Sequence, residues 1–461
     1  MAEVWTDEQM RQRFAGAGDF VARELVCGGQ KIYAYMIDGL VAGITVSDQV
    51  FRPLACMEPG DMENLYRKAR DGSVYNNVAQ PCSSLEDGVG KLLNGFCVVL
   101  FPGAGAVAYE TKSPEKRGIA PPEVENTVKG PRDAFTETMR TNTSLLRRHL
   151  RSPDLRLYQT TVGSQSLTNV TVAWIAGKAD PELPERMKRR LSELRTESFL
   201  SPAEVEELVT GNRKTPFPLM KYTERADSFA RGLLSGRVGL LVDGLPLGYL
   251  LPVDVGYLMT SPEDLGMDYV SASCIRVLRW GAMLLGLLLP GVYIALAMFH
   301  QQMIPLPLLR SIIDSKASVP FSAAGEVLGL LLCFELLQEA GLHLPRAIGQ
   351  SVSIIGGIVV GTAAVEASLI SPAALIAVSL AGICGFALPN RDFAQSLRLC
   401  RLLFTVLAAV SGLFGVTAGG IALVIHLAGL TSLEEPYLAP FSKGGELHLL
   451  RKRKQQGKES Q

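Results

Sequence analysis

Residues 280–309 read WGAMLLGLLLPGVYIALAMFHQQMIPLPLL and contain no Asp, Glu, Lys or Arg. A helix needs about 20 consecutive, mostly apolar residues to cross the hydrocarbon core of a bilayer. Residues 347–390, whose only charge is Glu366, and residues 402–433, which carry none, also meet this requirement. The sequence before residue 280 has no comparable run, so the chain is predicted to join a water-soluble region to a membrane bundle.

A further apolar stretch, residues 321–341, carries Glu326, Glu335 and Glu339. Ionised side chains are costly inside a bilayer, so this stretch crosses only if its carboxylates face protein or water. In a helix, Glu335 and Glu339 share one face, whereas Glu326 lies on roughly the opposite face. A helix lying in the membrane interface explains this pattern as well as a pore lining does.

The region before the apolar stretches alternates short strand-like runs with helical patterns, which is typical of an α/β architecture. Strands are expected at Lys31–Ile37, Cys97–Phe101, Val107–Glu110, Val170–Ile175 and Arg237–Val242, and helices at Arg132–Leu150 and Pro181–Leu194. The region is longer than a typical single domain, so we expect two subdomains.

The predicted fold is therefore an α/β cytosolic N-terminal region followed by an all-α polytopic membrane bundle. The subdomains are expected at residues 1–115 and 116–275, the bundle at 276–432 and a basic cytosolic tail at 433–461. The Pro, Gly and charge-rich stretch Ser113–Pro122 marks the first boundary, although it is equally compatible with a surface loop within one domain.

Features of the N-terminal region that resemble chemical sites have simpler explanations. Gly103-Ala-Gly105 lacks the third glycine of a phosphate loop, which favours a hairpin turn. Arg147, Arg148 and Arg151 either bind an anion or a lipid headgroup or form a solvated helix end, and the helix dipole favours the second. The eight cysteines form no CxxC pair, which indicates reduced thiols. We expect no catalytic site, no metal and no cofactor.

Both ends of the chain are expected in the cytoplasm. The N-terminus has no apolar signal-peptide core, and the tail carries the basic run Arg451–Lys454. This requires an even number of crossings, yet five apolar stretches are counted, around residues 280–299, 321–341, 347–370, 372–389 and 402–430. Either the stretch with three glutamates lies in the interface or the last run is broken at Gly419-Gly420, so we expect four to six spans.

Small residues in the apolar half indicate close helix packing. GxxxG spacing occurs at Gly325/Gly329, Gly357/Gly361 and Gly415/Gly419. Pro290 lies inside the first apolar run, where it is expected to kink the helix or to end it locally.

Several motifs, in order along the chain, resemble those of the GerA spore-germination family. Residues 117–138 read RGIAPPEVENTVKGPRDAFTET, and residues 361–372 read GTAAVEASLISP. Between them lie Val242-Asp-Gly-Leu-Pro246 and Ser261-Pro-Glu-Asp264. The resemblance covers roughly residues 20–440. It departs from the family pattern at Ala226, where proline is usual, and in a short basic tail.

This resemblance implies an A subunit of a nutrient germinant receptor in the inner membrane of bacterial endospores. Such a subunit is expected to be the oligomeric component that forms a cation channel, and to work with a transporter-like B subunit and a lipoprotein C subunit. The stage V sporulation protein AF branch is closely similar, but residues 242–246 and 261–264 look more like the receptor A subunits.

A ring of identical subunits would repeat any pore-facing carboxylate, which would attract cations and repel anions. The candidates for a pore lining or an inter-subunit contact are Glu326, Glu335, Glu339, Gln350, Thr362 and Glu366. For Glu366, a position at the membrane interface is an equally good interpretation.

Two other classes of function stay open. Broken helices at Ser371-Pro372 and Leu388-Pro389 are compatible with a secondary transporter, although no inverted repeat is apparent. A membrane scaffold without a pore is the third class.

Overall fold

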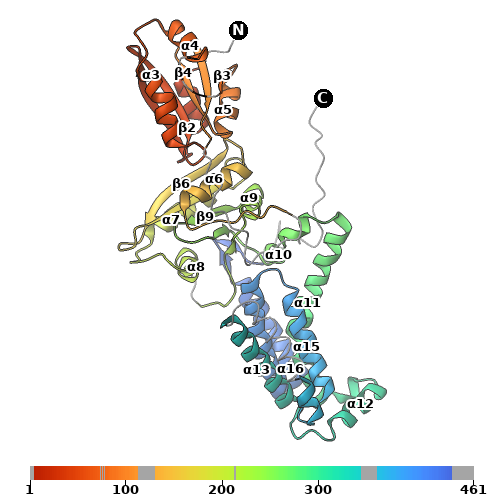
Figure 1. Cartoon of the computed structure of the whole chain (residues 1–461). Coiled ribbons are helices and arrows are strands. Elements are labelled where there is room, and N and C mark those ends of the chain that lie inside the picture. Colours follow the sequence, from red (N-terminus) through yellow and green to blue (C-terminus); the bar gives the residue numbers. More distant parts are fainter. Residues whose placement is uncertain are drawn as a thin grey trace, which may run out of the picture. The chain divides into compact units, whose positions relative to one another are not determined.

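A computed structural model describes residues 5–112 except 73, 75 and 77, together with residues 130–211, 214–343 and 361–438. The chain divides into two compact units (Figure 1). Unit 1 comprises residues 1–213 and 220–252, and unit 2 comprises residues 214–219 and 253–461. The expected boundary at Ser113–Pro122, Gln350 and the part of the predicted tail beyond residue 438 lie outside the described residues.

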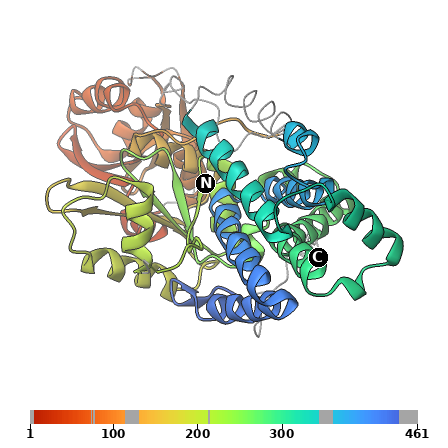
Figure 2. The ribbon, with the colours of Figure 1, turned by 90° about the horizontal axis from the view of Figure 1, so that it is seen from below.

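Unit 1 contains two five-stranded antiparallel sheets, which can be followed as red-orange and yellow-green ribbons in Figure 2. The first sheet has the order β1-β2-β4-β5-β3. Its strands are β1 (Phe20–Cys27), β2 (Gln30–Ile37), β3 (Ala79–Cys82), β4 (Phe96–Phe101) and β5 (Gly105–Glu110). All residues of β4 are buried, because alternate side chains enter apolar cores on the two faces of the sheet.

Helices cover both faces of this first sheet. On one face, α1 (Asp7–Arg13) and α5 (Leu85–Leu93) contribute Met10, Val89 and Leu92 to the core. The other face is covered by α2 (Gly43–Val46), η1 (Ser47–Phe51), α3 (Arg52–Ala55) and α4 (Met62–Arg70).

Burial also disfavours the thiolate form of the cysteines in this sheet. It raises the pKa of the Cys97 thiol to about 12 and that of Cys82 to about 11, because the thiolate would lose its hydration.

The second sheet has the order β6-β7-β9-β10-β8. Its strands are β6 (Leu155–Val162), β7 (Thr168–Ile175), β8 (Lys221–Thr223), β9 (Val238–Val242) and β10 (Gly248–Leu251), and its helices are α6 (Met139–His149), α7 (Glu182–Glu193), α8 (Pro202–Thr210) and α9 (Ala226–Leu234). Phe229 of α9 lies directly on Gly239 and Gly248, where an added Cβ would come within 2.5 Å of its ring. These glycines let α9 pack closely on the sheet.

The five predicted strands are confirmed to within two residues, and so is the helix predicted at Pro181–Leu194. Gly103 adopts φ 80° in the turn between β4 and β5, as expected for a hairpin. The helix expected at Arg132–Leu150 begins only at Met139. The residues before it are extended, because Phe135 N–H donates to Glu224 O at 2.7 Å in place of a helical acceptor.

The prediction that Arg147 belongs to a solvated helix end is wrong. Its side chain is fully buried between the two sheets of unit 1, where Nε donates to Asp19 Oδ2 at 2.6 Å and Nη2 to Oδ1 at 2.7 Å. Arg147 also donates to the carbonyls of Ser152 and Leu155. Arg148, the next residue, is exposed.

Unit 2 is built from long apolar helices. They are α11 (Tyr269–Met298), α12 (Leu306–Lys316), α13 (Ala323–His343), α15 (Pro372–Phe386) and α16 (Arg391–Ala428), preceded by the short α10 (Val255–Leu258) and η2 (Pro262–Leu265) and with η3 (Gln301–Met303) between α11 and α12. Both α11 and α16 are long and apolar enough to cross a membrane. Helix α11 continues through Pro290 instead of ending there.

Helix α16 is a helical hairpin that reverses at Gly412. This residue has φ 61° and ψ −141°, a conformation that favours glycine. Residues 391–411 and 413–428 pack against each other, because Gly415 approaches the backbone of Leu407 and Gly419 the side chains of Leu407 and Phe404. The last run is therefore broken, as one of the two alternatives required, but the break lies at Gly412 and not at Gly419-Gly420.

The two ends of unit 2 can be defined by their contacts. At the proximal end, Ser432 Oγ accepts from Val253 N–H at 2.9 Å, and Tyr437 O accepts from Val255 N–H at 3.1 Å. At the distal end, Gly412 lies beside Phe299. The chain therefore enters α11 and leaves α16 at the same end.

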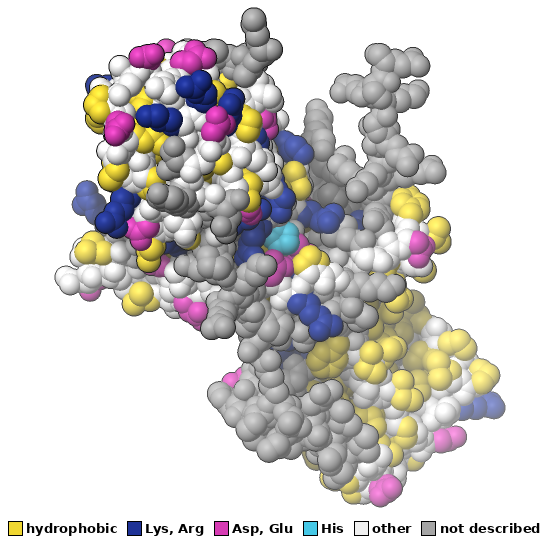
Figure 3. Space-filling view, turned by 45° about the horizontal axis from the view of Figure 1, so that its top comes forward, with side chains coloured by type: hydrophobic (Ala, Val, Ile, Leu, Met, Phe, Trp, Pro, Cys, Tyr) yellow, Lys and Arg dark blue, Asp and Glu magenta, His cyan; other side chains and the backbone are white. Residues whose placement is uncertain are grey.

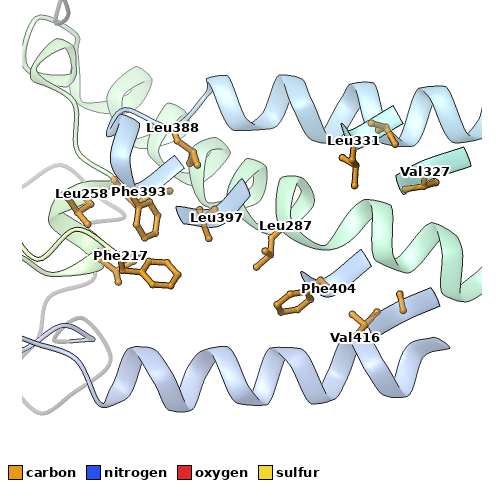
Figure 4. Close-up of a cluster of buried hydrophobic side chains, with 14 of the residues drawn as sticks. Phe217, Leu258, Leu287, Val327, Leu331, Leu388, Phe393, Leu397, Phe404 and Val416 are labelled. Carbon is orange, nitrogen blue, oxygen red and sulfur yellow. The ribbon is translucent and has the colours of Figure 1, made fainter. Parts of the chain in front are cut away.

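Helices α11, α13, α15 and α16 lie side by side in Figures 1 and 2 and share one apolar core. Figure 4 shows how their side chains meet: Leu287 of α11, Val327 and Leu331 of α13, and Phe404 and Val416 of α16 point into the same space. Phe217 joins this core at the proximal end, where its ring lies 6.1 Å from that of Phe393.

Candidate functional site: charged residues inside the helical bundle

Asp264 attaches the start of α11 to the turn before it. Its Oδ2 accepts from Arg276 Nε at 2.9 Å and from Arg279 Nη1 at 3.0 Å, and Arg279 Nη2 lies 2.8 Å from Oδ1. The Asp264 side chain is fully buried, and each arginine side chain keeps only 9% of its exposure. Two cations of unit 2 thus share one buried carboxylate near its proximal end.

The local sequence explains this arrangement. In Ser261-Pro-Glu-Asp264 the Ser261 and Asp264 side chains form a capping box, which orients the Asp264 carboxylate toward α11. Arg276 and Arg279 are three residues apart and therefore lie on the same face of the helix.

Glu335 of α13 forms a second cluster with two arginines of α16. Its carboxylate accepts from Nε and Nη2 of Arg398, and its Oε1 also accepts from Arg401 Nη2 at 3.2 Å. Arg401 is buried and donates in addition to Ala381 O of α15 at 3.3 Å. This carboxylate is therefore neutralised within the chain, which argues against its serving as a bare charge in a pore.

Glu326, one of the first residues of α13, forms a third cluster at the distal end. Its Oε2 accepts from Ser371 N–H at 2.8 Å and from Ser371 Oγ at 2.6 Å, and Lys316 Nζ lies 3.1 Å from Oε1. Ser371 is the N-cap of α15, so the carboxylate lies at the positive end of that helix dipole. Glu326 is fully buried and ties together α12, α13 and α15.

The other predicted residues that the structure describes are exposed. Residues 361–366 are helical, and Thr362 and Glu366 at this helix end are exposed in the single chain. Glu339 is also exposed, one turn beyond Glu335. The candidates thus comprise the buried, paired Glu326, the half-buried, paired Glu335 and three exposed polar residues, while Gln350 lies outside the described part.

The surface of unit 2 is strongly apolar. Among the described residues, 29 of the 35 large hydrophobic side chains that are exposed lie between Tyr269 and Ile425. Figure 3 shows such side chains gathered in yellow over the helical unit. A surface of this kind is unusual for a soluble protein and is typical of contact with lipid or with another protein.

A sequence profile of the family described as "Bacillus/Clostridium GerA spore germination protein" matches residues 8–452. The chain belongs to the GerA family. Membership confirms the resemblance found in the sequence motifs and supports a role in spore germination.

Two of the proteins similar to this chain are from Bacillus subtilis (strain 168). Spore germination protein KA is 34% identical over 444 residues, which is 95% of this chain and 82% of that protein. Uncharacterized membrane protein YfkQ is 33% identical over 429 residues, which is 93% of this chain and 83% of that protein. The N-terminal domain of the A subunit of the Bacillus megaterium germinant receptor GerK3 aligns with 55% of this chain and 97% of that chain, at 24% identity and a TM-score of 0.43.

The sequence did not lead us to predict the arginines that pair with Asp264 and Glu335. Arg398 and Arg401 stand three residues apart at the edge of an apolar run, and Arg276 and Arg279 do the same before another. Paired cations at helical spacing beside an apolar stretch, together with isolated acids inside a neighbouring stretch, are a signal that could have predicted buried ion pairs.

Proposed function

We propose that this chain is the A subunit of a spore nutrient germinant receptor and that it forms part of a cation channel in the spore inner membrane. The observation that carries the proposal is the helical unit, which has an apolar surface and an interior of buried, paired charges. Buried pairs allow charged side chains to stay in a bilayer, where unpaired ones would be costly. The germination proteins among its relatives give the biological role.

The path of the chain supports six crossings with both ends in the cytoplasm. Among the described residues, helices α11, α13, α15 and the two halves of α16 supply five passages, and both ends on one side of the membrane require one more. The entry to α11 and the exit from α16 lie at one end, as an even number requires. The basic run Arg451–Lys454 favours the cytoplasm for that end.

Among the predicted candidates, Glu366 is the best pore or inter-subunit residue. Glu326 and Glu335 are already paired with cations of the same chain. Glu366 is exposed at the end of a helix, and none of the described residues forms an ion pair with it. In a homo-oligomer, such a carboxylate would be repeated around the axis and would lower the energy of a passing cation.

Glu366→Gln is expected to reduce potassium flux. Removing one charge about 4 Å from the ion costs about 1 kcal/mol even at the permittivity of water, so the flux should fall at least about fivefold. The measurement is potassium flux through liposomes that contain the receptor with its B and C subunits. Asp314→Asn, on the exposed face of α12, removes the same charge elsewhere and should leave the flux unchanged.

An unchanged flux in the Glu366→Gln receptor, at equal protein content, would exclude Glu366 from the pore. Absence of any conductance in the unmodified receptor would instead favour a scaffold, and saturable solute counterflow would identify a transporter.

A further inference from the structure

Helix α12 differs from the other long helices of unit 2, because none of its 11 residues is buried. The other long helices described in this unit each bury several side chains in the shared apolar core. Yet α12 carries Leu306, Leu308 and Ile313, which are 59%, 54% and 52% exposed in the single chain. An apolar helix without a place in the core is expected to have another apolar partner.

Helix α12 lies at the distal end of the bundle. It follows Phe299, which contacts Gly412 at that end, and it precedes α13. Figures 1 and 2 show it projecting to one side of the other helices. Its 11 residues span only about 16 Å, which is about half of the hydrocarbon core of a bilayer. This helix is therefore too short to be a membrane crossing.

The half-buried residues of α12 mark the side that faces the bundle. Leu309, Ile312 and Lys316 follow one another at intervals of three and four, so they lie on one face of the helix, and Ser315 lies at its border. At the end of this face, Lys316 Nζ lies 3.1 Å from the buried Oε1 of Glu326. This ion pair attaches α12 to the start of α13 and defines where its other faces point.

The two flanks beside that face differ in polarity. Leu306 and Ile313 are seven residues apart, which places both on one flank. Ser311 is two residues from Ile313 and therefore lies across the helix from it, on the same flank as Leu308. One flank is thus wholly apolar, and the other is mixed.

Exposed apolar side chains also occur on both sides of α12 in the chain. Met303 of η3 precedes it and Phe321 follows it, and both are exposed. Arg310 and Asp314 are one turn apart on the side of α12 away from the bundle, where both are exposed. Exposed apolar side chains next to charged ones on a short helix are typical of helices that lie in the interface of a bilayer.

We propose that α12 lies flat in the lipid–water boundary at the distal end of the bundle, with Leu306 and Ile313 toward the acyl chains and Ser311 toward water. Such a helix places its apolar side about 5–10 Å into the boundary between headgroups and acyl chains. Arg310 lies next to Leu306 on the helix surface, where its long side chain can reach lipid phosphates. The proposal rests on the membrane placement of the proposed function, which puts the other exposed apolar side chains of unit 2 in lipid, and it adds lipid as the partner of α12.

Tryptophan substitution measures this placement. The full-length variants Ile313→Trp and Ser311→Trp are reconstituted in vesicles of equal parts phosphatidylethanolamine and phosphatidylglycerol, and the emission added to that of the three natural tryptophans is recorded. Lipid brominated in the upper part of its acyl chains should quench most of the added emission of Ile313→Trp and little of that of Ser311→Trp. Acrylamide dissolved in the water should give the opposite order.

Two further sets of variants complete the experiment. Leu306→Trp repeats the test on the apolar flank and should behave as Ile313→Trp does, even if the latter fails to fold. Ile383→Trp and Ile421→Trp, at exposed positions of α15 and α16, are references for membrane placement. Both should be quenched by lipid brominated deeper in its acyl chains.

Lipid quenching of the references, with the apolar-flank variants quenched only by acrylamide, would place α12 in water and overturn the proposal, while the proposed function would stand. Apolar-flank variants that resist both quenchers would place α12 against a second copy of the chain, which also overturns it. So would equal lipid quenching of Ile313→Trp and Ser311→Trp, because α12 would then have no distinct lipid-facing flank. Lipid quenching of neither reference would contradict the membrane placement itself and the proposal with it.

Discussion

Replacement of Asp264 by asparagine is expected to lower the free energy of unfolding of unit 2 by about 3–5 kcal/mol, because it leaves two buried arginines without their shared counter-charge. Arg276 and Arg279 keep only 9% of their side-chain exposure, so water cannot replace the carboxylate without movement of the start of α11. The measurement is thermal unfolding of the purified full-length protein in detergent.

The neighbouring Glu263 offers a matched control for this experiment. It is only partly buried, whereas Asp264 is fully buried, and Glu263→Gln should change stability by no more than about 0.5 kcal/mol. Equal effects of the two substitutions would mean that the carboxylate of Asp264 does not hold α11. A large effect limited to Asp264 would support its role as the attachment of this helix, and it would predict altered germination in the corresponding spores.

Arg147→Met is expected to destabilise unit 1 by about 3–5 kcal/mol, because it leaves the carboxylate of Asp19 buried and unpaired. Arg147 is fully buried and donates two hydrogen bonds to Asp19, in the turn before β1. Urea unfolding of the full-length protein in detergent, followed by a probe in unit 1, measures the loss. Arg148→Met, at the exposed neighbouring residue, should have little effect.

The double substitution Arg147→Met with Asp19→Leu separates pairing from packing. Replacing both members of a buried ion pair by apolar residues is often neutral, so the double variant should recover most of the lost stability. If the double variant is as unstable as Arg147→Met alone, the cost comes from lost packing and from the carbonyl contacts of Arg147 instead of from the unpaired charge.

The sequence predicts well those parts of the structure that depend on local pattern. Alternation and β-branched runs located β2, β4, β5, β7 and β9, because a buried strand has few alternatives, but the buried strand β10 was not predicted. Long apolar runs located α11 and α16. The edge strand β1 was missed, since its residues are mostly only partly buried and do not alternate clearly.

Features that depend on contacts between distant residues could not be predicted. Glu326 and Glu335 looked like pore carboxylates because their partners, Lys316 and Arg398, come from other helices. One of the two alternatives for the last apolar run placed a break at Gly419-Gly420, yet α16 reverses at Gly412, where the chain must leave the helical conformation to turn back. Gly419 instead supplies the space for the returning half. When several glycines occur in one apolar run, the sequence does not indicate at which of them the helix reverses and which of them allow close helix packing.

Potassium release from spores that lack this gene tests the central claim most directly. The spores are exposed to a panel of amino acids, sugars and nucleosides, and the deleted gene is then restored as a control. A receptor A subunit predicts loss of potassium release in response to some nutrients, with normal responses to the others. A uniform slowing in response to every nutrient would contradict the account and would indicate a role in amplification, as expected for the stage V sporulation AF branch.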